Sequence, residues 1–341
     1  MTDKSQPLVS VVTPVYNCAE YLSECIESVL AQSYQNWEYV IVNNCSTDAS
    51  AQIARKYATR DPRIRVFDNQ HFLRAVANYN QGLRQISPAS KYSKIVFADD
   101  WIFPACLEEM VALAEEYPSV GIVGAYGLKD TEVMWVGLPH PSRCVSGREV
   151  CRRLFLDGLY VFGSATSLLY RSSLVRERAS FYNEANIHSD MEACVSALRN
   201  CDFGFVHQVL SFSRVRPGSL ETISSDYNSI AAGKLHDLAA YGRDFLTSKE
   251  YAACLDRSVS LYYESLVGGA LRGVDSRYWN FHKKTLAEAG IKFSRARLFK
   301  VALTKLCKAT LTPRAAVETF VEIAKEFVRR RRTSIDSIET K

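Results

Sequence analysis

The 341-residue chain lacks several patterns that define other classes of protein. Its ten cysteines form no Cys-x-x-Cys pair and have no histidine-rich spacing, so we expect neither a zinc site nor a disulfide framework. No run approaches the roughly 20 apolar residues of a membrane span, and the N-terminal MTDKSQP lacks the apolar core of a signal peptide. These absences favour a protein of the reducing cytoplasm.

A strong charge imbalance is also absent. The net charge of +5 gives no reason to expect nucleic acid as a partner. The basic excess collects after Arg295 and ends in Arg329–Arg332. The length predicts one large domain with an appended helical part.

The first two thirds of the chain alternate between strand and helix patterns. Short apolar runs predict strands at 8–12, 37–42, 64–67, 94–97 and 120–123, and helices at 20–32, 49–57, 75–85 and 104–117 separate them. This alternation predicts an α/β fold with a doubly wound, mostly parallel sheet in residues 1–225. Helices at 230–241, 249–268 and 276–289 indicate a helical region over 226–341.

Two adjacent acids, Asp99 and Asp100, follow the predicted strand Lys94–Phe97. Neighbouring carboxylates repel each other, and ligands of open α/β sheets bind beyond the carboxyl ends of the strands. A hard cation such as Mg²⁺ or Mn²⁺ takes one or two carboxylates together with substrate phosphates. The alternative is that one acid only begins the helix that Pro104 opens.

The segment LVSVVTPVYNCAEYLSECIESVLAQSYQNWEYVIVNNCSTDAS, followed by FADDWIFP, resembles glycosyltransferase family 2, whose members have the GT-A fold. The resemblance spans roughly residues 9–192 and weakens towards 220. It implies transfer of a sugar from a nucleoside-diphosphate sugar to an acceptor hydroxyl, with inversion and with Mg²⁺ or Mn²⁺.

The resemblance assigns donor-binding residues. It places Thr13, Pro14 and Tyr16 in the loop that contacts the nucleoside. Asn43 and Asn44 stand where the family often has two aspartates, and an Asn such as Asn44 can still accept the N3–H of uracil or thymine, which favours UDP or dTDP.

The same resemblance extends to the phosphates and the metal. Asn80 matches a position beneath the donor, although an asparagine packed in a helix is the equal alternative. Asp99 is assigned to donor ribose or metal and Asp100 to metal, with Phe97 where many relatives carry a first carboxylate. In FSRVRPGSL, Arg216 replaces a histidine of the family, so Arg214 or Arg216 is expected to stabilise the diphosphate.

The predicted base for the acceptor hydroxyl is Asp190, in the segment Ser189-Asp190-Met191-Glu192. Direct displacement at an anomeric carbon requires a carboxylate near the attacking oxygen. The alternative is structural: Ser189 and Glu192 match a capping box, and the helix dipole favours an acid in the first turn. The capping box accounts for Glu192, which we leave out of catalysis.

The C-terminal sequence after Ser294 predicts a basic amphipathic helix with Phe299, Ala302, Leu303 and Leu306 on one face. Such a helix can lie on the inner face of the cell membrane, which would make a lipid-linked saccharide a reasonable acceptor. The alternative is packing against the catalytic domain or a second subunit of a homo-oligomer. Residues 329–341 are predicted to be disordered.

Two other functions remain open from the sequence. A nucleotidyltransferase of sugar phosphates also uses paired acids and a metal, but TPVYNCAEY lacks the glycines and lysines of a triphosphate-binding loop. A non-catalytic nucleotide-sugar-binding module is suggested by Phe97, Asn43, Asn44 and Arg216 at positions where the family has other groups.

Overall fold

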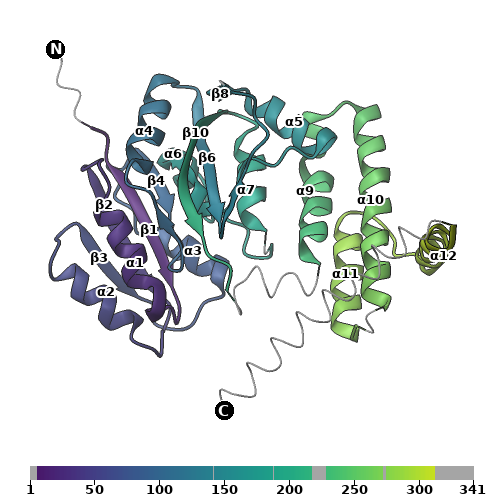
Figure 1. Cartoon of the computed structure of the whole chain (residues 1–341), viewed down its shortest axis with the longest axis horizontal. Coiled ribbons are helices and arrows are strands. Elements are labelled where there is room, and N and C mark those ends of the chain that lie inside the picture. The colour runs from purple at the N-terminus through teal and green to yellow at the C-terminus, as the bar shows by residue number, and fades with distance from the viewer. Residues whose placement is uncertain (1–5, 141, 187, 217–227, 272–273, 312–341) are drawn as a thin grey trace. The chain divides into compact units, whose positions relative to one another are not determined.

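The computed structural model describes residues 6–140, 142–186, 188–216, 228–271 and 274–311 (Figure 1). The chain forms two compact units. The first comprises residues 1–215 and 241–251, and the second comprises residues 216–240 and 252–341. The domain boundary predicted after residue 225 lies outside the described residues.

A ten-stranded sheet is the centre of the first unit, in the order β3-β2-β1-β4-β9-β6-β10-β5, with β7 on β6 and β8 on β10. The strands are β1 (Val9–Val15), β2 (Trp37–Asn43), β3 (Ile64–Asp68), β4 (Tyr92–Ile95), β5 (Trp101–Ile102), β6 (Val120–Lys129), β7 (Glu132–Met134), β8 (Cys144–Val145), β9 (Leu168–Arg171) and β10 (Asp202–Ser213). β1 pairs in parallel with β2 and β4, whereas β9 is antiparallel to β4 and β6. The predicted α/β class is confirmed, and its short antiparallel strands make the sheet mixed.

Helices cover both faces of this sheet. Every residue of β1 is buried, although successive side chains of a strand point to opposite faces, so both faces must be covered. Val11 packs with α1 (Ala19–Leu30), α2 (Ser50–Ala58) and α4 (Cys106–Glu116). Val12 packs with the opposite layer, formed by α3 (Ala75–Leu83), α5 (Gly147–Asp157) and α7 (Ser189–Ala197). The first unit also contains the 3₁₀ turn η1 (Ala165–Ser167) and α6 (Ser172–Arg176).

The helix α3 approaches the sheet closely at Gly82. A Cβ at this position would lie 2.5 Å from the Cγ1 of Val12 on β1. Glycine is therefore required for the close packing of α3 against β1.

Sequence periodicity located most elements of the first unit to within a few residues. Among the predicted strands the largest difference is β6, predicted at 120–123 and observed over Val120–Lys129, and the apolar pattern predicted no strand at the positions of β5 and β7 to β10. The extra length of β6 follows from the twelve-residue β10, which pairs with it in parallel as far as Ser213. A local apolar pattern does not record that partner, because the two strands are far apart in sequence.

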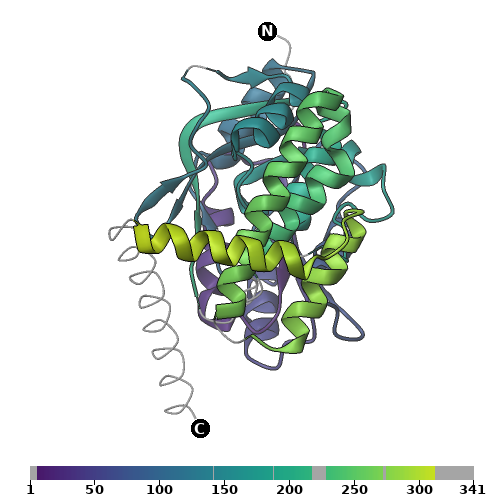
Figure 2. The same ribbon diagram turned by 90° about the vertical axis from the view of Figure 1, so that its right-hand side faces the viewer.

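The second unit is helical. It contains most of α9 (Ser229–Phe245) and α10 (Ser248–Leu271), together with α11 (Ser276–Glu288) and α12 (Arg295–Leu311). Its core includes Tyr262, Tyr263, Leu266, Tyr278 and Leu286. Figure 2 looks onto α12, which contacts α10 through the Nζ of Lys305. Among the described residues, no helix has the length and apolarity to cross a membrane.

Candidate active site

The paired acids lie where the chain leaves β4. Asp100 is buried, and its Oδ2 accepts hydrogen bonds from Thr166 Oγ1 at 2.7 Å and Ser213 Oγ at 3.3 Å. Its Oδ1 accepts from the backbone N–H of Arg214 at 3.0 Å. Asp99 is only partly buried. The structure thus fixes one carboxylate from η1 and the end of β10 and leaves its neighbour closer to solvent.

Electrostatics make the Asp100 carboxyl an unusual acid. Burial is the largest cause, and the charge of Asp99 adds to it, so that the pKa of Asp100 rises to about 7 despite its hydrogen bonds. A charged pair in this position requires positive charge or strong donors nearby.

Thr166 connects Asp100 to the sheet. Its Oγ1 accepts the backbone N–H of Phe97 at 3.1 Å while donating to Asp100. Below it, the buried Nζ of Lys94 donates to the carbonyl oxygens of Thr166 at 2.6 Å and Leu168 at 3.2 Å. Burial lowers the pKa of Lys94. Lys94 therefore holds η1 against β4, and η1 in turn holds the acid.

Asp190 occupies the first turn of α7. Its Oδ1 accepts the backbone N–H of Met191 at 2.8 Å. Part of the side chain reaches solvent, yet the surrounding protein atoms desolvate the carboxyl enough to raise its pKa to about 6. A carboxyl with this pKa is charged at neutral pH and accepts a proton more readily than an ordinary aspartate.

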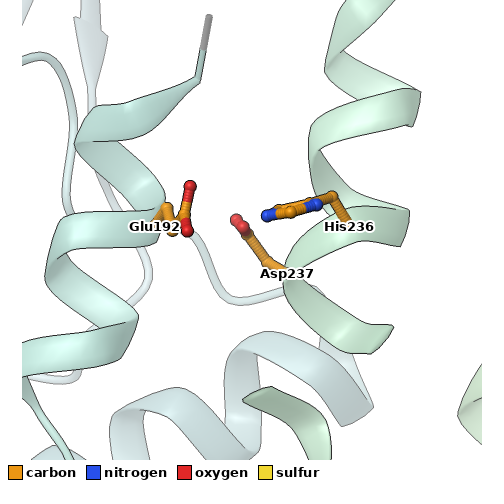
Figure 3. Close-up of side chains that lie close together, drawn as sticks. All are labelled: Glu192, His236 and Asp237. Carbon is orange, nitrogen blue, oxygen red and sulfur yellow. The ribbon is translucent and has the colours of Figure 1, made fainter. Parts of the chain in front are cut away.

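The predicted capping box at the start of α7 is wrong. The N-cap is His188 and makes no side-chain cap hydrogen bond. The carboxylate of Glu192, which projects from α7 in Figure 3, instead accepts from Asn186 Nδ2 at 2.8 Å, Tyr241 OH at 2.9 Å and Asn183 Nδ2 at 3.0 Å. Asn183 and Asn186 of the preceding loop therefore bind the Glu192 carboxylate, which a capping box would instead direct to a backbone N–H at the start of α7.

Tyr79 on α3 is a common neighbour of the three acids. Burial is the main cause of its raised pKa, and the charges of Asp190, Asp99 and Asp100 raise that pKa further. Its ring lies 5.0 Å from the ring of Phe97, centroid to centroid. The charges of the acid pair and of the predicted base thus all act on one phenol, although these acids are about 90 residues apart in sequence.

Thr13 and Pro14, at the end of β1, are buried. The Thr13 Oγ1 lies 2.8 Å from both the Tyr39 hydroxyl and the Val96 carbonyl oxygen, so its side chain serves the core. Tyr16 is 47% exposed, and its ring packs edge-on against that of Phe72, which is 55% exposed, with centroids 4.9 Å apart. Exposed aromatic rings of this kind suit the face of a nucleobase, and sequence reasoning missed Phe72 because a lone aromatic in a loop carries no pattern.

The two asparagines after β2 hold neighbouring loops. Asn43 Nδ2 donates to Asp68 Oδ1 at 2.8 Å, and the resulting stabilisation is the main cause of the lowered pKa of Asp68. Asn44 Oδ1 accepts from Leu73 N and Asn69 Nδ2, both at 2.9 Å, and its Nδ2 donates to the Leu73 carbonyl. The contact of Asn44 with a base stays a prediction.

Comparison with known proteins gives the family. Residues 10–177 match the family described as Glycosyl transferase family 2. This part of the chain belongs to glycosyltransferase family 2.

EpsE of Bacillus subtilis is 33% identical over 155 residues, which cover 43% of this chain and 55% of EpsE, so the match spans about half of that relative. Residues 1–349 of S. aureus TarS, in complex with UDP-GlcNAc, superpose with a TM-score of 0.62 at 17% identity, covering 87% of this chain and 84% of that one. A mannosyltransferase from Pyrobaculum calidifontis, in complex with GDP-Man and Mn²⁺, gives 0.52 at 15% identity, covering 84% of this chain and 87% of that one. The predicted GT-A fold is confirmed.

Asn80 lies within the part of the chain that matches family 2, and its side chain is buried. Its Nδ2 donates to the Tyr182 carbonyl at 2.8 Å and to Glu184 Oε1 at 3.1 Å, and its Oδ1 accepts the Tyr182 N–H at 2.9 Å. These bonds tie α3 to the loop that leads into α7 and Asp190. The structural alternative for Asn80 therefore accounts for its amide, and contact with a donor stays a prediction.

The predicted phosphate-binding arginines differ in position. Arg214 Nε donates to the Asp99 carbonyl at 3.2 Å, and its Nη2 pairs with Glu24 at 2.6 Å. The guanidinium also lies over the ring of Tyr21, 4.7 Å from its centroid. Arg216 belongs to the second unit, at the edge of the described residues, and its role stays a prediction.

The donor set at the acid pair fits the cation that the fold implies. Asp99 and Asp100 offer only carboxylate oxygens, the ligands that Mg²⁺ and Mn²⁺ prefer. The hydroxyl of Thr166 and the backbone N–H of Arg214 orient Asp100 from outside, as supporting groups do at metal sites.

Proposed function

We propose that this chain is an inverting, metal-dependent glycosyltransferase that moves a sugar from a nucleoside-diphosphate sugar to an acceptor hydroxyl in polysaccharide or glycolipid assembly. UDP and dTDP are the favoured donors, because an asparagine at the position of Asn44 can still accept the N3–H of uracil or thymine. The supporting observations are that the charges of Asp99, Asp100 and Asp190 all act on the phenol of Tyr79, and that Thr166 and Ser213 hold the Asp100 carboxylate.

In this proposal Asp190 is the base. The acceptor hydroxyl gives its proton to the Asp190 carboxylate while the acceptor oxygen forms a bond to the anomeric carbon. The bond between that carbon and the diphosphate oxygen breaks, and the nucleoside diphosphate leaves with the electron pair. Attack on the face opposite the leaving group inverts the anomeric centre. The raised pKa of Asp190 matches the task of taking a proton near neutral pH.

Asp99 and Asp100 would hold Mg²⁺ or Mn²⁺, which when bound offsets the charge developing on the diphosphate. The guanidinium of Arg214 lies beside this pair through its bond to the Asp99 carbonyl. Its ion pair with the half-exposed Glu24 is a surface pair of small net stability, so Arg214 can exchange Glu24 for a phosphate at little cost.

A donor panel tests the proposal. UDP-, dTDP- and GDP-sugars are incubated with the chain, with and without Mn²⁺, and sugar release and transfer are measured. We expect turnover that requires the cation and that falls by about 100-fold or more in Asp190→Asn, with donor binding retained in a thermal-shift assay. Asp157→Asn makes the same chemical change at an exposed site on α5 and should leave turnover unchanged.

Two results would replace the proposal. Consumption of a sugar phosphate and a nucleoside triphosphate would establish the nucleotidyltransferase. Donor binding with neither release nor transfer for any sugar and acceptor would leave the binding module, which Phe97, Asn43 and Asn44 in place of acids already suggest.

A further inference from the structure

The helix α12 has an apolar side that the described residues of its own unit leave exposed. Leu298 and Val301 pack against the helical core of the second unit. Phe299 and Leu303 are 71% and 50% exposed. At about 100° per residue, these two lie on the side of the helix opposite Val301. A surface helix ordinarily has one apolar stripe, which faces its core, so a second stripe indicates a further partner.

Basic residues border the outer stripe. Arg295 and Lys300 are both exposed, and helical geometry places them on either side of Phe299. Cys307 continues the stripe and is also exposed. The helix sequence, RARLFKVALTKLCKATL, contains no acid, so no carboxylate of α12 offsets these charges.

The nearby acids belong to the packed side. Asp256 and Glu264 of α10 line the groove of about 670 Å³ between α10 and α12. Arg297 turns into this groove, where its Nη2 lies 3.5 Å from Asp256 Oδ1, and Lys305 Nζ donates to the Glu264 carbonyl. Lys300 is exposed but also lines this groove, whereas Arg295 is exposed and lies outside it.

We propose that the outer side of α12 binds an anionic lipid surface. Phe299 and Leu303 enter the boundary between headgroups and acyl chains, and Arg295 meets the lipid phosphates. This is the arrangement by which amphipathic helices lie in an interface. A second copy of the chain is a poorer occupant, because a two-fold contact through this face sets the same basic residues against each other. The proposal goes beyond the proposed function and does not depend on it.

Flotation of the full chain with vesicles tests it. Vesicles of phosphatidylcholine with about one third phosphatidylglycerol are compared with phosphatidylcholine alone. We expect binding to the anionic vesicles that weakens as KCl is raised from about 0.05 M to about 0.5 M, because salt screens the charges. Phe299→Ser with Leu303→Ser should lower the binding constant by about tenfold or more, since little apolar area remains to insert.

A matched pair of charge reversals separates position from net charge. Arg295→Glu lies beside the outer stripe, whereas Arg60→Glu makes the same change at an exposed position just after α2. Only Arg295→Glu should weaken vesicle binding. Equal effects of the two reversals, or full binding by the Phe299/Leu303 variant, would overturn the proposal. A dimer that this double variant dissociates, together with no vesicle binding by the wild type, would also overturn it and assign the face to self-association.

Discussion

The Thr166 hydroxyl donates to the Asp100 carboxylate at 2.7 Å, across 66 residues of chain. Because the same hydroxyl accepts the Phe97 N–H, its direction is fixed by the backbone that carries the acid pair. The short turn η1 therefore orients the Asp100 carboxylate, and the buried Lys94 in turn holds η1 in place.

Removing this hydroxyl should weaken the cation site without unfolding the protein. Thr166→Val keeps the side-chain volume but loses both hydrogen bonds, so Asp100 loses its shortest support. We expect about tenfold weaker apparent Mn²⁺ affinity in activity titrations and a similar loss of kcat/KM at limiting metal. Thr166→Ser should restore both. Equal Mn²⁺ affinities for the Val and Ser variants would show that the hydroxyl does not orient the acid.

The pH profile should report Asp190. Burial raises its pKa from 3.8 to about 6, and only the carboxylate can take the acceptor proton. The charged form therefore predominates above about pH 6, and kcat/KM should fall about tenfold per pH unit below it. Rates measured from pH 5 to 8 at saturating metal check this. A profile with its acidic limb near pH 4 would mean that Asp190 is not the base or is not desolvated.

Tyr79 should contribute a hydrogen-bond donor to the bound substrates. The charges of all three acids act on its phenol, its raised pKa keeps it protonated, and its hydroxyl makes no hydrogen bond to the part of the chain that the structure describes. Tyr79→Phe keeps the ring against Phe97 and should leave the melting temperature unchanged. We expect kcat/KM to fall about tenfold, and separate kcat and KM values will show whether the loss is in turnover or in binding. Unchanged kinetics would make Tyr79 a packing residue only.

Gly82 should be intolerant of a methyl group. Gly82→Ala places a Cβ 2.5 Å from Val12 Cγ1, so α3 must shift from β1, at a cost of about 1–3 kcal/mol in the free energy of unfolding. Gly268→Ala in α10 is the matched control, because a Cβ there meets nothing within 4 Å. Higher helix propensity should stabilise that variant by up to about 1 kcal/mol. Urea unfolding of both variants measures the difference.

Family motifs that combine several residues in a fixed order identified the candidate site residues, whereas single local patterns such as the capping box did not predict the observed hydrogen bonds. The acid pair at the end of a buried strand and the acid of Ser-Asp-Met-Glu led to the predicted site residues Asp99, Asp100 and Asp190, whose charges all act on the phenol of Tyr79. The capping box failed because Glu192 has closer partners in the loop amides of Asn183 and Asn186 than in its own helix end. A local motif shows which hydrogen bonds a side chain can make within its own helix, but it does not show which other donors the fold brings to that side chain.

The amino-acid order alone determined the alternation of strands and helices, the family and the residues at the strand ends, because burial periodicity and short motifs are local properties of the chain. Only the tertiary structure decided that Thr166 and Lys94 support Asp100, that Asn80 ties α3 to the loop before α7, and that Phe299 and Leu303 face outwards. Those relationships join residues far apart in sequence or depend on which side of a helix is covered. Tertiary packing within each unit determines these long-range contacts and these exposed faces.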